Sequence, residues 1–506
     1  MPRIILRVLL PILILLTSKA FALPIDWHGV FGVDSTLIDS YRRVKSVTDN
    51  SSSGNAGDGG TQEVPLASGN HANASWQSYI FRLNPVMIIN DSATLKGEIT
   101  SGYGRGGRLG DNSTQSQEAG FGNALYVQNT SDENDSVIIN KVYAELYSDT
   151  ATWVIGRHSS EWGLGVIQNA GNDTWDRHTF VRDGVTMKIK LGNFHIQPFW
   201  AKINSNGSLT RATKVKEYGI SLLYDNPERD MSFGILFSKK QNGAFDGQQL
   251  TGINSAQPVG AASATTTAIG RTDVKLTDIY FRKAFGDLEI AFEVPILSGD
   301  LGFLYGNLTT PTKYKAKAII FESKYKASES WTIGFDAGKV SGDAGGTSSF
   351  DAMYLNPNYQ IANLLFRYNT RAVSNPNDPN AVNGKSVYDS YITNTMYARF
   401  GVKYTAEKWT WNTGFIWARA EETAKTGATA FNHQSNKAFD AVKAQSDDLG
   451  YEVDFGFEYQ WNKEIQVGAS LGYLFAGDYW SFTNDPNVTN STQNSYAAQI
   501  RTSIDF

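Results

Sequence analysis

The stretch 451–461, YEVDFGFEYQW, places a large apolar side chain at every odd position. The even positions hold Glu452, Asp454, Gly456, Glu458 and Gln460. Successive side chains of an extended strand point to opposite faces of a sheet. The stretch therefore predicts a strand with one apolar face and one acidic face.

The same alternation recurs along the chain. Apolar residues occupy every second position in 79–83, 185–191, 290–294, 398–404 and 465–473. None of these runs shows the sustained period of about 3.6 residues that marks an amphipathic helix. High aromatic content (12%) and 47 glycines also favour strands and turns over helices. We expect an all-β fold.

Length and composition limit the function classes. A chain of 506 residues can form two or three domains or one large closed sheet. The net charge of −5 and the absence of a basic run argue against a nucleic-acid partner. The chain has no cysteine, which excludes disulfides, thiolate metal sites and a cysteine nucleophile.

The first 22 residues, MPRIILRVLLPILILLTSKAFA, form a unit of their own. Arg3 and Arg7 precede an apolar run that ends near an Ala-Phe-Ala triplet. This order is typical of a cleavable secretory signal peptide. The alternative is a membrane anchor, but the apolar run is shorter than the roughly 20 residues that a spanning helix needs. We expect residues 23–506 to form the mature domain.

The connections between the predicted strands alternate between short and long. Short connections have hairpin-turn composition, as in 90–92, 192–193 and 462–464. Long connections are rich in Gly, Ser, Asn and Thr, as in 47–63 and 241–270. This pattern is typical of a transmembrane antiparallel barrel with short periplasmic turns and long extracellular loops. Apolar faces would then contact lipid, and polar faces would line the interior.

Eighteen strands are predicted, and counts of 16 or 20 stay open. The number is even because both ends of a bacterial barrel normally lie in the periplasm. The predicted strands are 25–43, 75–89, 93–105, 137–148, 151–158, 182–191, 194–204, 215–226, 230–241, 273–285, 288–298, 313–327, 330–341, 391–405, 408–420, 449–462, 465–479 and 495–506. The stretch 358–371 also alternates, but counting it would give an odd number. We therefore expect 342–390, like 159–181, to be a loop that folds inward and narrows the barrel.

The C-terminal stretch SYAAQIRTSIDF resembles the last strand of Gram-negative outer-membrane barrels. Tyr496, Ile500, Ile504 and the terminal Phe506 lie on one face of this predicted strand. The resemblance implies that these residues are the signal read by the barrel-assembly machinery. The alternative is an ordinary edge strand that ends in phenylalanine.

The whole predicted mature chain resembles outer-membrane porin-like barrels. Its start, LPIDWHGVFGVDSTLIDSYRR, is similar to the major outer-membrane protein of Bdellovibrio-type predatory bacteria. The segment VIGRHSSEWGLGVIQNAGND also resembles a pattern in larger barrels such as alginate exporters. The resemblance implies outer-membrane lipid and lipopolysaccharide as surroundings, passive diffusion or facilitated export through the lumen, and a homotrimer.

The polar positions of the alternating runs are the candidate pore lining. They are Arg82, Lys96, Glu98, Glu145, Arg157, Lys188, Lys190, Asp278, Arg282, Glu289, Glu293, Asp336, Arg399, Lys403, Glu452, Asp454, Glu458, Arg501 and Asp505. Charges of both signs across a constriction would order water and reject apolar solutes. Alternatively, these charges pair with each other and only hold the wall in shape.

Catalytic and metal motifs are weak in this sequence. The cluster His158, Asp173, Asp176, Arg177, His178 and Asp183 could form a metal or catalytic site, but we favour the interpretation of a loop pinned by ion pairs and amides. No spacing of histidines typical of zinc and no G-x-S-x-G motif occurs. We expect no enzyme, no cofactor and no metal.

The sequence thus predicts an outer-membrane channel for passive diffusion of small hydrophilic solutes. Two alternatives remain open, a transport barrel specific for carbohydrate or polysaccharide, and a structural or adhesive surface barrel with a closed lumen.

Overall fold

The computed structural model describes residues 25–41, 43–44, 73–101, 105–109, 137–204, 215–242, 273–301, 312–346, 348–369, 387–433, 437–487 and 489–506. The predicted signal segment 1–22 lies outside the described residues. In the described part of the chain, no helix is long and apolar enough to cross a bilayer. The helical segments named there are two short 3-10 turns, η3 (Pro227–Arg229) and η4 (Asp478–Ser481).

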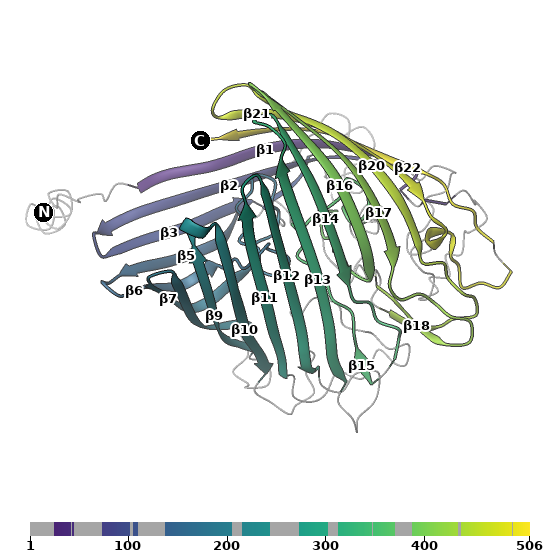
Figure 1. Ribbon diagram of the computed structural model, residues 1–506, viewed down its shortest axis with the longest axis horizontal. Helices are drawn as coiled ribbons and strands as arrows, with labels where there is room; N and C mark the ends of the chain where they lie inside the picture. Colours follow the sequence, from purple (N-terminus) through teal and green to yellow (C-terminus); the bar gives the residue numbers. More distant parts are fainter. Residues whose placement is uncertain are drawn as a thin grey trace, which may run out of the picture.

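Long antiparallel strands form one continuous sheet (Figure 1). They are β1 (Ile25–Asp39), β2 (Ala74–Asn90), β3 (Ala93–Ser101), β5 (Val137–Tyr147), β6 (Ala151–Ser159), β7 (Val181–Leu191), β8 (Phe194–Asn204), β9 (Val215–Asn226), β10 (Met231–Asn242), β11 (Asp273–Phe285), β12 (Leu288–Asp300), β13 (Lys313–Lys326), β14 (Trp331–Val340), β16 (Thr395–Ala406), β17 (Trp409–Ala420), β20 (Asp448–Gln460), β21 (Ile465–Ala476) and β22 (Ser495–Asp505). Within the described residues the sheet holds 20 strands, and leaving out the short β4 (Gly106–Leu109) and β15 (Ser349–Phe350) gives eighteen. A separate hairpin joins β18 (Thr429–Asn432) to β19 (Lys437–Asp440).

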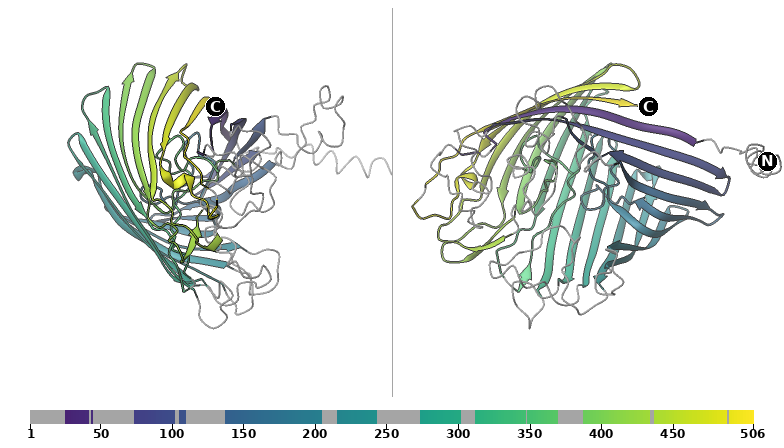
Figure 2. Two further views of the ribbon diagram at one scale, coloured as in Figure 1. Left: turned by 90° about the vertical axis from the view of Figure 1, so that its right-hand side faces the viewer. Right: turned by 180° about the vertical axis from the view of Figure 1, so that it is seen from behind.

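The sheet closes on itself between its first and last strands. β1 pairs with both β2 and β22, and Figure 2 shows β1 and β22 side by side in the wall. At the end of this seam, the Phe506 N–H donates to the Gly29 carbonyl (3.0 Å) and the Gly29 N–H donates to the Phe506 carbonyl (2.6 Å). A Cβ at Gly29 would lie 2.4 Å from the Phe506 ring, so the ring needs glycine at this position. The protein is a closed, antiparallel, eighteen-stranded barrel.

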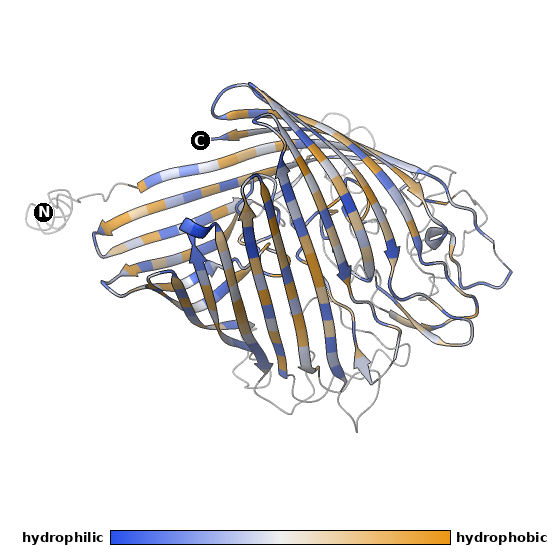
Figure 3. Ribbon diagram, viewed as in Figure 1, coloured by the Kyte–Doolittle hydropathy of each residue, from blue (hydrophilic) through white to orange (hydrophobic). Residues whose placement is uncertain are grey.

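The two faces of each strand differ in character (Figure 3). On β20, Phe455 is 49% exposed on the outer face, while Glu452 on the inner face is fully buried. Outward side chains of the other strands are mostly large and apolar as well. A closed barrel pairs its backbone groups internally, so an apolar outer surface of this extent fits a hydrocarbon environment.

Aromatic side chains gather at the end of the barrel that carries the short turns. They include Phe194, Tyr224, Tyr325, Trp331, Trp409, Trp411, Tyr459 and Trp461. Tyrosine and tryptophan prefer the boundary between hydrocarbon and head groups. The position of this girdle therefore marks one edge of the predicted membrane.

The predicted strands agree with the structure to within a few residues. β16 begins at Thr395 rather than 391, and β21 ends at Ala476 rather than 479, because the 3-10 turn η4 follows it closely. The part of 358–371 that the structure describes, 358–369, holds no strand. The prediction of eighteen strands is confirmed, whereas β4, β15 and the β18–β19 hairpin were not predicted.

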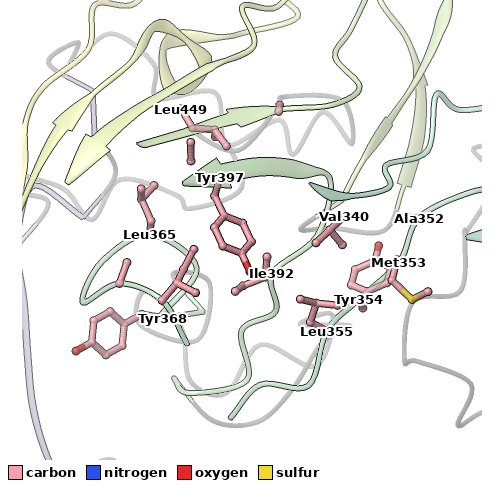
Figure 4. Packing of buried hydrophobic residues seen from close by; sticks show 14 of the residues in the cluster. Val340, Ala352, Met353, Tyr354, Leu355, Leu365, Tyr368, Ile392, Tyr397 and Leu449 are labelled. Atoms are coloured by element: carbon pink, nitrogen blue, oxygen red, sulfur yellow. The ribbon is translucent and has the colours of Figure 1, made fainter. Parts of the chain in front are cut away.

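The largest buried apolar cluster lies inside the barrel. It combines inward side chains of the wall, such as Tyr397, Ile416 and Leu474, with residues between β14 and β16. Figure 4 shows Met353, Leu355, Leu365 and Ile392 among the residues of this cluster. The protein therefore has its apolar core within the lumen, on the inner side of a wall whose outer side is also apolar.

Candidate functional site

Strand register decides which predicted residues face the lumen. Inward positions lie in cross-strand rows with buried side chains, as for Glu322 opposite Asp336 and Asp336 opposite Arg399. The predicted pore-lining residues on the inner face are Arg82, Lys96, Glu98, Glu145, Lys188, Lys190, Asp278, Arg282, Glu289, Glu293, Asp336, Arg399, Lys403, Glu452, Asp454, Glu458, Arg501 and Asp505. That they line a path for solutes stays a prediction.

The prediction that Arg157 faces the lumen is wrong. It shares the outer face of β6 with Trp153 and Ile155, which are both exposed. Its guanidinium pairs with Asp183 of the neighbouring strand β7, with Nε at 2.6 Å from Oδ1. Trp153 and Ile155 are apolar and lie at odd positions, which correctly indicates that the odd positions of β6, Arg157 included, face outward. His158 is the inward residue of this segment.

Many inward charges pair between strands, three of the following pairs across adjacent strands and the fourth, Arg501 of β22 with Glu458 of β20, across the intervening strand β21. Lys96 Nζ lies 2.8 Å from Glu145, Arg282 lies 2.6 Å from Glu289, Arg399 lies 2.7 Å from Asp336, and Arg501 lies 2.5 Å from Glu458. Ladder pairs of this kind hold the wall in shape. For these four pairs, the alternative interpretation applies, in which the charges pair with each other and hold the wall in shape.

The β6–β7 loop, residues 160–180, enters the lumen and is held there by arginines. Arg177 reaches the wall, with Nη2 at 2.6 Å from Asp34 of β1 and 2.7 Å from the Ser78 hydroxyl of β2. Arg82 and Arg105 both donate to the Gly171 carbonyl, at 3.0 and 2.6 Å. Charge-assisted hydrogen bonds of this kind are stronger than neutral ones.

A second contact fixes the opposite side of this loop. The Leu164 N–H donates to the Glu293 carboxylate of β12. Trp162 packs with Phe199, Leu236 and Leu276, which face inward from β8, β10 and β11. The β6–β7 loop thus spans the lumen from β1 and β2 to β8–β12.

The predicted metal or catalytic cluster around this loop does not converge. His158 Nε2 lies 2.8 Å from the Thr186 hydroxyl, His178 Nε2 lies 3.2 Å from Asp389, and Asp183 faces outward. Asp176 accepts the Asp173 N–H at 3.0 Å. These contacts match the alternative of a loop pinned by polar contacts.

The β14–β16 loop, residues 341–394, is held by a buried carboxylate and by the apolar core. Glu452 accepts the backbone N–H groups of Asn363 (2.9 Å), Leu364 (2.7 Å) and Leu365 (2.7 Å). Arg43, from the segment after β1, donates to the Leu364 carbonyl at 3.2 Å. Three amide donors on one carboxylate replace the water that Glu452 loses on burial.

The two loops also bind each other. The Asn356 N–H donates to the Val166 carbonyl at 2.7 Å, and the Asn358 side chain donates to the His178 carbonyl at 2.8 Å. The Tyr388 hydroxyl donates to the same Asp34 carboxylate that Arg177 contacts (2.8 Å). The lumen is therefore crossed by one connected layer made of both loops.

A polar hollow of about 560 Å³ lies between this layer and the wall. It is lined by Asp34, Asp173, Thr174, Trp175, Asp176, Arg177, His178, Pro357, Asn358, Gln360, Arg367, Tyr388, Lys403, Glu458, Gln466, Gln499 and Arg501. Lys403, Glu458 and Gln466 lie within three residues of the short-turn ends of their strands. The hollow therefore lies toward the end of the barrel with the short turns.

The charges around the hollow are only partly compensated. Arg177 and Arg501 have carboxylate partners in Asp34 and Glu458. Among the described residues, Lys403 and Arg367 take part in none of the ion pairs found. Burial in the β6–β7 loop raises the pKa of Asp176 to about 6. Asp173 and Asp176, which also line the hollow, take part in none of these ion pairs either. The hollow thus presents two cations and two carboxyl groups that have no ion-pair partner among the described residues.

Several residues of the site were missed from the sequence. Asp34 alternates with Phe31, Val33 and other outward residues of β1, so parity could have revealed it. Trp175 and Arg367 lie in loops without periodicity, and no local signal shows that their side chains reach the hollow. Arg177 was expected in the ion pairs that pin the β6–β7 loop, but its partner Asp34 was not.

The fold is assigned from the strand pairing, because comparisons with known proteins found only distant structural similarity. No family model and no curated protein sequence matches the chain. Solved structures similar to it include OpdQ of Pseudomonas aeruginosa, at 10% identity over 95% of this chain and 98% of that chain, with a TM-score of 0.46. OpdK, an outer membrane protein of the same organism, has 9% identity over 95% and 99% of the two chains and a TM-score of 0.45. OmpT of Vibrio cholerae has 10% identity over 95% and 97%, with a TM-score of 0.34.

Proposed function

We propose that the barrel is an outer-membrane channel through which small hydrophilic solutes diffuse passively. The polar hollow of about 560 Å³ beside the loop layer is the observation that supports this function most directly. A barrel of about 16–18 strands is wide enough for an aqueous channel. Here the two loops reduce that width, so size and charge at the hollow would select the solute.

The uncompensated cations give the channel an expected selectivity. Lys403 and Arg367 line the hollow from the wall and from the β14–β16 loop. Fixed charges at a constriction favour the counter-ion and repel the co-ion. Asp173 and Asp176 of the β6–β7 loop oppose this preference. Because burial raises the pKa of Asp176 to about 6, we expect weak anion selectivity below that pH for a channel that passes through this hollow.

Conductance in planar bilayers tests the proposal. Purified protein in potassium chloride should form ion-conducting channels. At about pH 5, where Asp176 is mostly protonated, a salt gradient should give a reversal potential of the sign expected for anions. The Lys403→Glu/Arg367→Glu variant should reverse that sign. A matched control is Lys275→Glu, because Lys275 lies on the outer face of β11. No conductance from correctly folded protein would contradict the proposal.

The same experiment separates the alternatives. A carbohydrate-specific barrel would show conductance that a sugar blocks at low concentration. A structural barrel with a closed lumen would conduct only after loop removal. The resemblance to the major outer-membrane protein of predatory bacteria, cleavage after residue 22, the assembly role of Phe506 and a homotrimer stay predictions, which cell fractionation, N-terminal sequencing and native mass measurement would test.

A further inference from the structure

Five lysines lie on the outer face of neighbouring strands near the long-loop end of the barrel. They are Lys202 of β8, Lys216 of β9, Lys275 of β11, and Lys315 and Lys317 of β13, here called the lysine arc. All five side chains are exposed. Strand pairing places Lys202 opposite Lys216, while Ser298 of β12 stands between Lys275 and Lys315. The lysine arc is thus one continuous surface across β8–β13.

The height of the lysine arc coincides with the far edge of the apolar band. Lys202 lies eight residues from the start of β8 at Phe194, and Lys317 lies nine residues from the end of β13 at Lys326. A rise of about 3.3 Å per residue and a tilt of about 40° place these lysines roughly 20–25 Å from the short-turn end. Lipid-facing apolar bands of such barrels are about 25 Å tall. The ammonium groups therefore lie at the level of lipid head groups.

The lysine arc carries uncompensated charge. Other outward cations nearby have carboxylate partners, because Lys239 pairs with Asp273 (2.7 Å) and Lys313 pairs with Asp300 (2.5 Å). In the described ranges, no ion pair involves a lysine of the arc. Burial raises the pKa of Asp351 in the β14–β16 loop, and the nearby charge of Lys315 opposes that rise, so Asp351 compensates Lys315 in part. The other four lysines need anions from outside the described chain to balance their charge.

The opposite side of the barrel differs at the same height. There β20, β21 and β22 present Tyr451, Tyr473, Phe475 and Tyr496. These rings suit the interface without attracting charge. A basic surface on one side only indicates a localised partner rather than a general need for solubility.

We propose that the lysine arc binds the phosphate groups of anionic lipids in the leaflet next to the long loops. Each lysine close to an anionic membrane surface contributes about 1 kcal/mol to the attraction. The spacing of the arc across the six strands β8–β13 lets several lipids, or one lipid with several phosphates, contact it together. The proposal requires the barrel to lie in a membrane but does not depend on solute passage.

Native mass spectrometry of the full chain released from lipid nanodiscs tests this site. The nanodiscs contain phosphatidylcholine with a minor fraction of phosphatidylglycerol as the anionic probe. The test variant is Lys275→Gln/Lys315→Gln/Lys317→Gln. The matched control, Lys188→Gln/Lys190→Gln/Lys403→Gln, removes the same charge from the inner face. Circular dichroism and heat-modifiable migration confirm folding of both.

The wild-type protein should retain phosphatidylglycerol in preference to phosphatidylcholine, and the control should keep this preference. In the arc variant the preference should fall by at least about tenfold. Equal retention in the wild type and the arc variant would overturn the proposal, as would an equal loss in both variants. A changed number of chains per particle in the arc variant would identify a subunit interface instead, which also overturns it.

Discussion

The two loops that fill the lumen are attached to the wall in different ways. The β6–β7 loop is held by guanidinium groups, with Arg177 on Asp34 and with Arg82 and Arg105 on Gly171. The β14–β16 loop packs Met353 and other apolar side chains against the wall, and wall carboxylates such as Glu452 and Asp454 accept its backbone N–H groups. Both loops reach buried positions, but one depends on electrostatics and the other on apolar packing.

The barrel interior is therefore not uniform in chemical character. Near β13–β17 the inner wall is made of small and apolar residues such as Ala316, Ala318 and Ala418, which leave room for the β14–β16 loop. Near β1–β3 the wall carries Asp34, Glu98 and other polar groups that match the arginines. Each part of the wall thus fits its own loop.

Removing the β14–β16 loop should produce the largest effect. Val340 and Thr395 are paired across β14 and β16, so deleting 342–390 leaves a short hairpin connection. We expect conductance in planar bilayers to rise several-fold, because the deletion removes one of the two loops that form the layer across the lumen. Unchanged conductance in a folded variant would show that this loop does not narrow the path.

Truncating a core side chain of the same loop tests its apolar attachment. Leu365 is fully buried in the lumen cluster. The Leu365→Ala variant should lower the free energy of loop opening by about 2–5 kcal/mol. Hydrogen exchange of the peptide containing 361–369 measures this change, and Val442→Ala, at an exposed loop position, is the control. Equal protection in Leu365→Ala would contradict apolar attachment.

Charge removal tests the attachment of the β6–β7 loop. The Arg177→Gln variant leaves Asp34 buried without a cation, which costs about 3 kcal/mol or slightly more in comparable pairs. Ser78 and Tyr388 still donate to Asp34, so we expect the lower end of that range. Faster hydrogen exchange should appear in 171–180 and not in 361–369. A spread of the effect to both loops would mean that they open as one unit.

Acidification should have the smallest effect, and in the β14–β16 loop it acts through His433 and Asp343. His433 accepts the Asp343 N–H at 2.7 Å, and burial lowers the pKa of His433 to about 3. An unfolded histidine has a pKa of about 6.5. Between these two pKa values, His433 binds a proton when the β14–β16 loop is detached and not when the loop is packed against it. Packing of the loop is therefore strongest above about pH 6.5 and weakens as pH falls toward 3.

The Asp343 carboxyl acts in the opposite direction. Burial raises its pKa to about 6, so the packed loop gains stability as Asp343 takes up a proton below that pH. The Asp343→Asn variant removes this opposing group. In that variant, hydrogen exchange of 341–346, corrected for intrinsic rates, should accelerate as pH falls from about 6.5 to 4. The His433→Gln/Asp343→Asn double variant should show no such acceleration.

The sequence by itself determined the wall of this protein. In each strand, period-two alternation, as in Phe455 beside Asp454, follows from local geometry, because side chains of an extended chain must point to opposite faces. The same alternation placed Lys188, Arg399 and Glu452 on the inner face. Applied to Trp153 and Ile155, it would also have placed Arg157 on the outer face. Turn composition marked the hairpins, and the need for an even strand number excluded 358–371 as a strand.

Only the tertiary structure decided what fills the lumen and which cations are uncompensated. Arg177 meets Asp34 across 143 positions of sequence, and Glu452 meets Leu364 across 88. No local pattern encodes such contacts, since they depend on how far each strand is shifted around the closed barrel. The lysine arc likewise exists because the pairing register of β8–β13 brings residues 202 to 317 to one height, which sequence distance does not reveal.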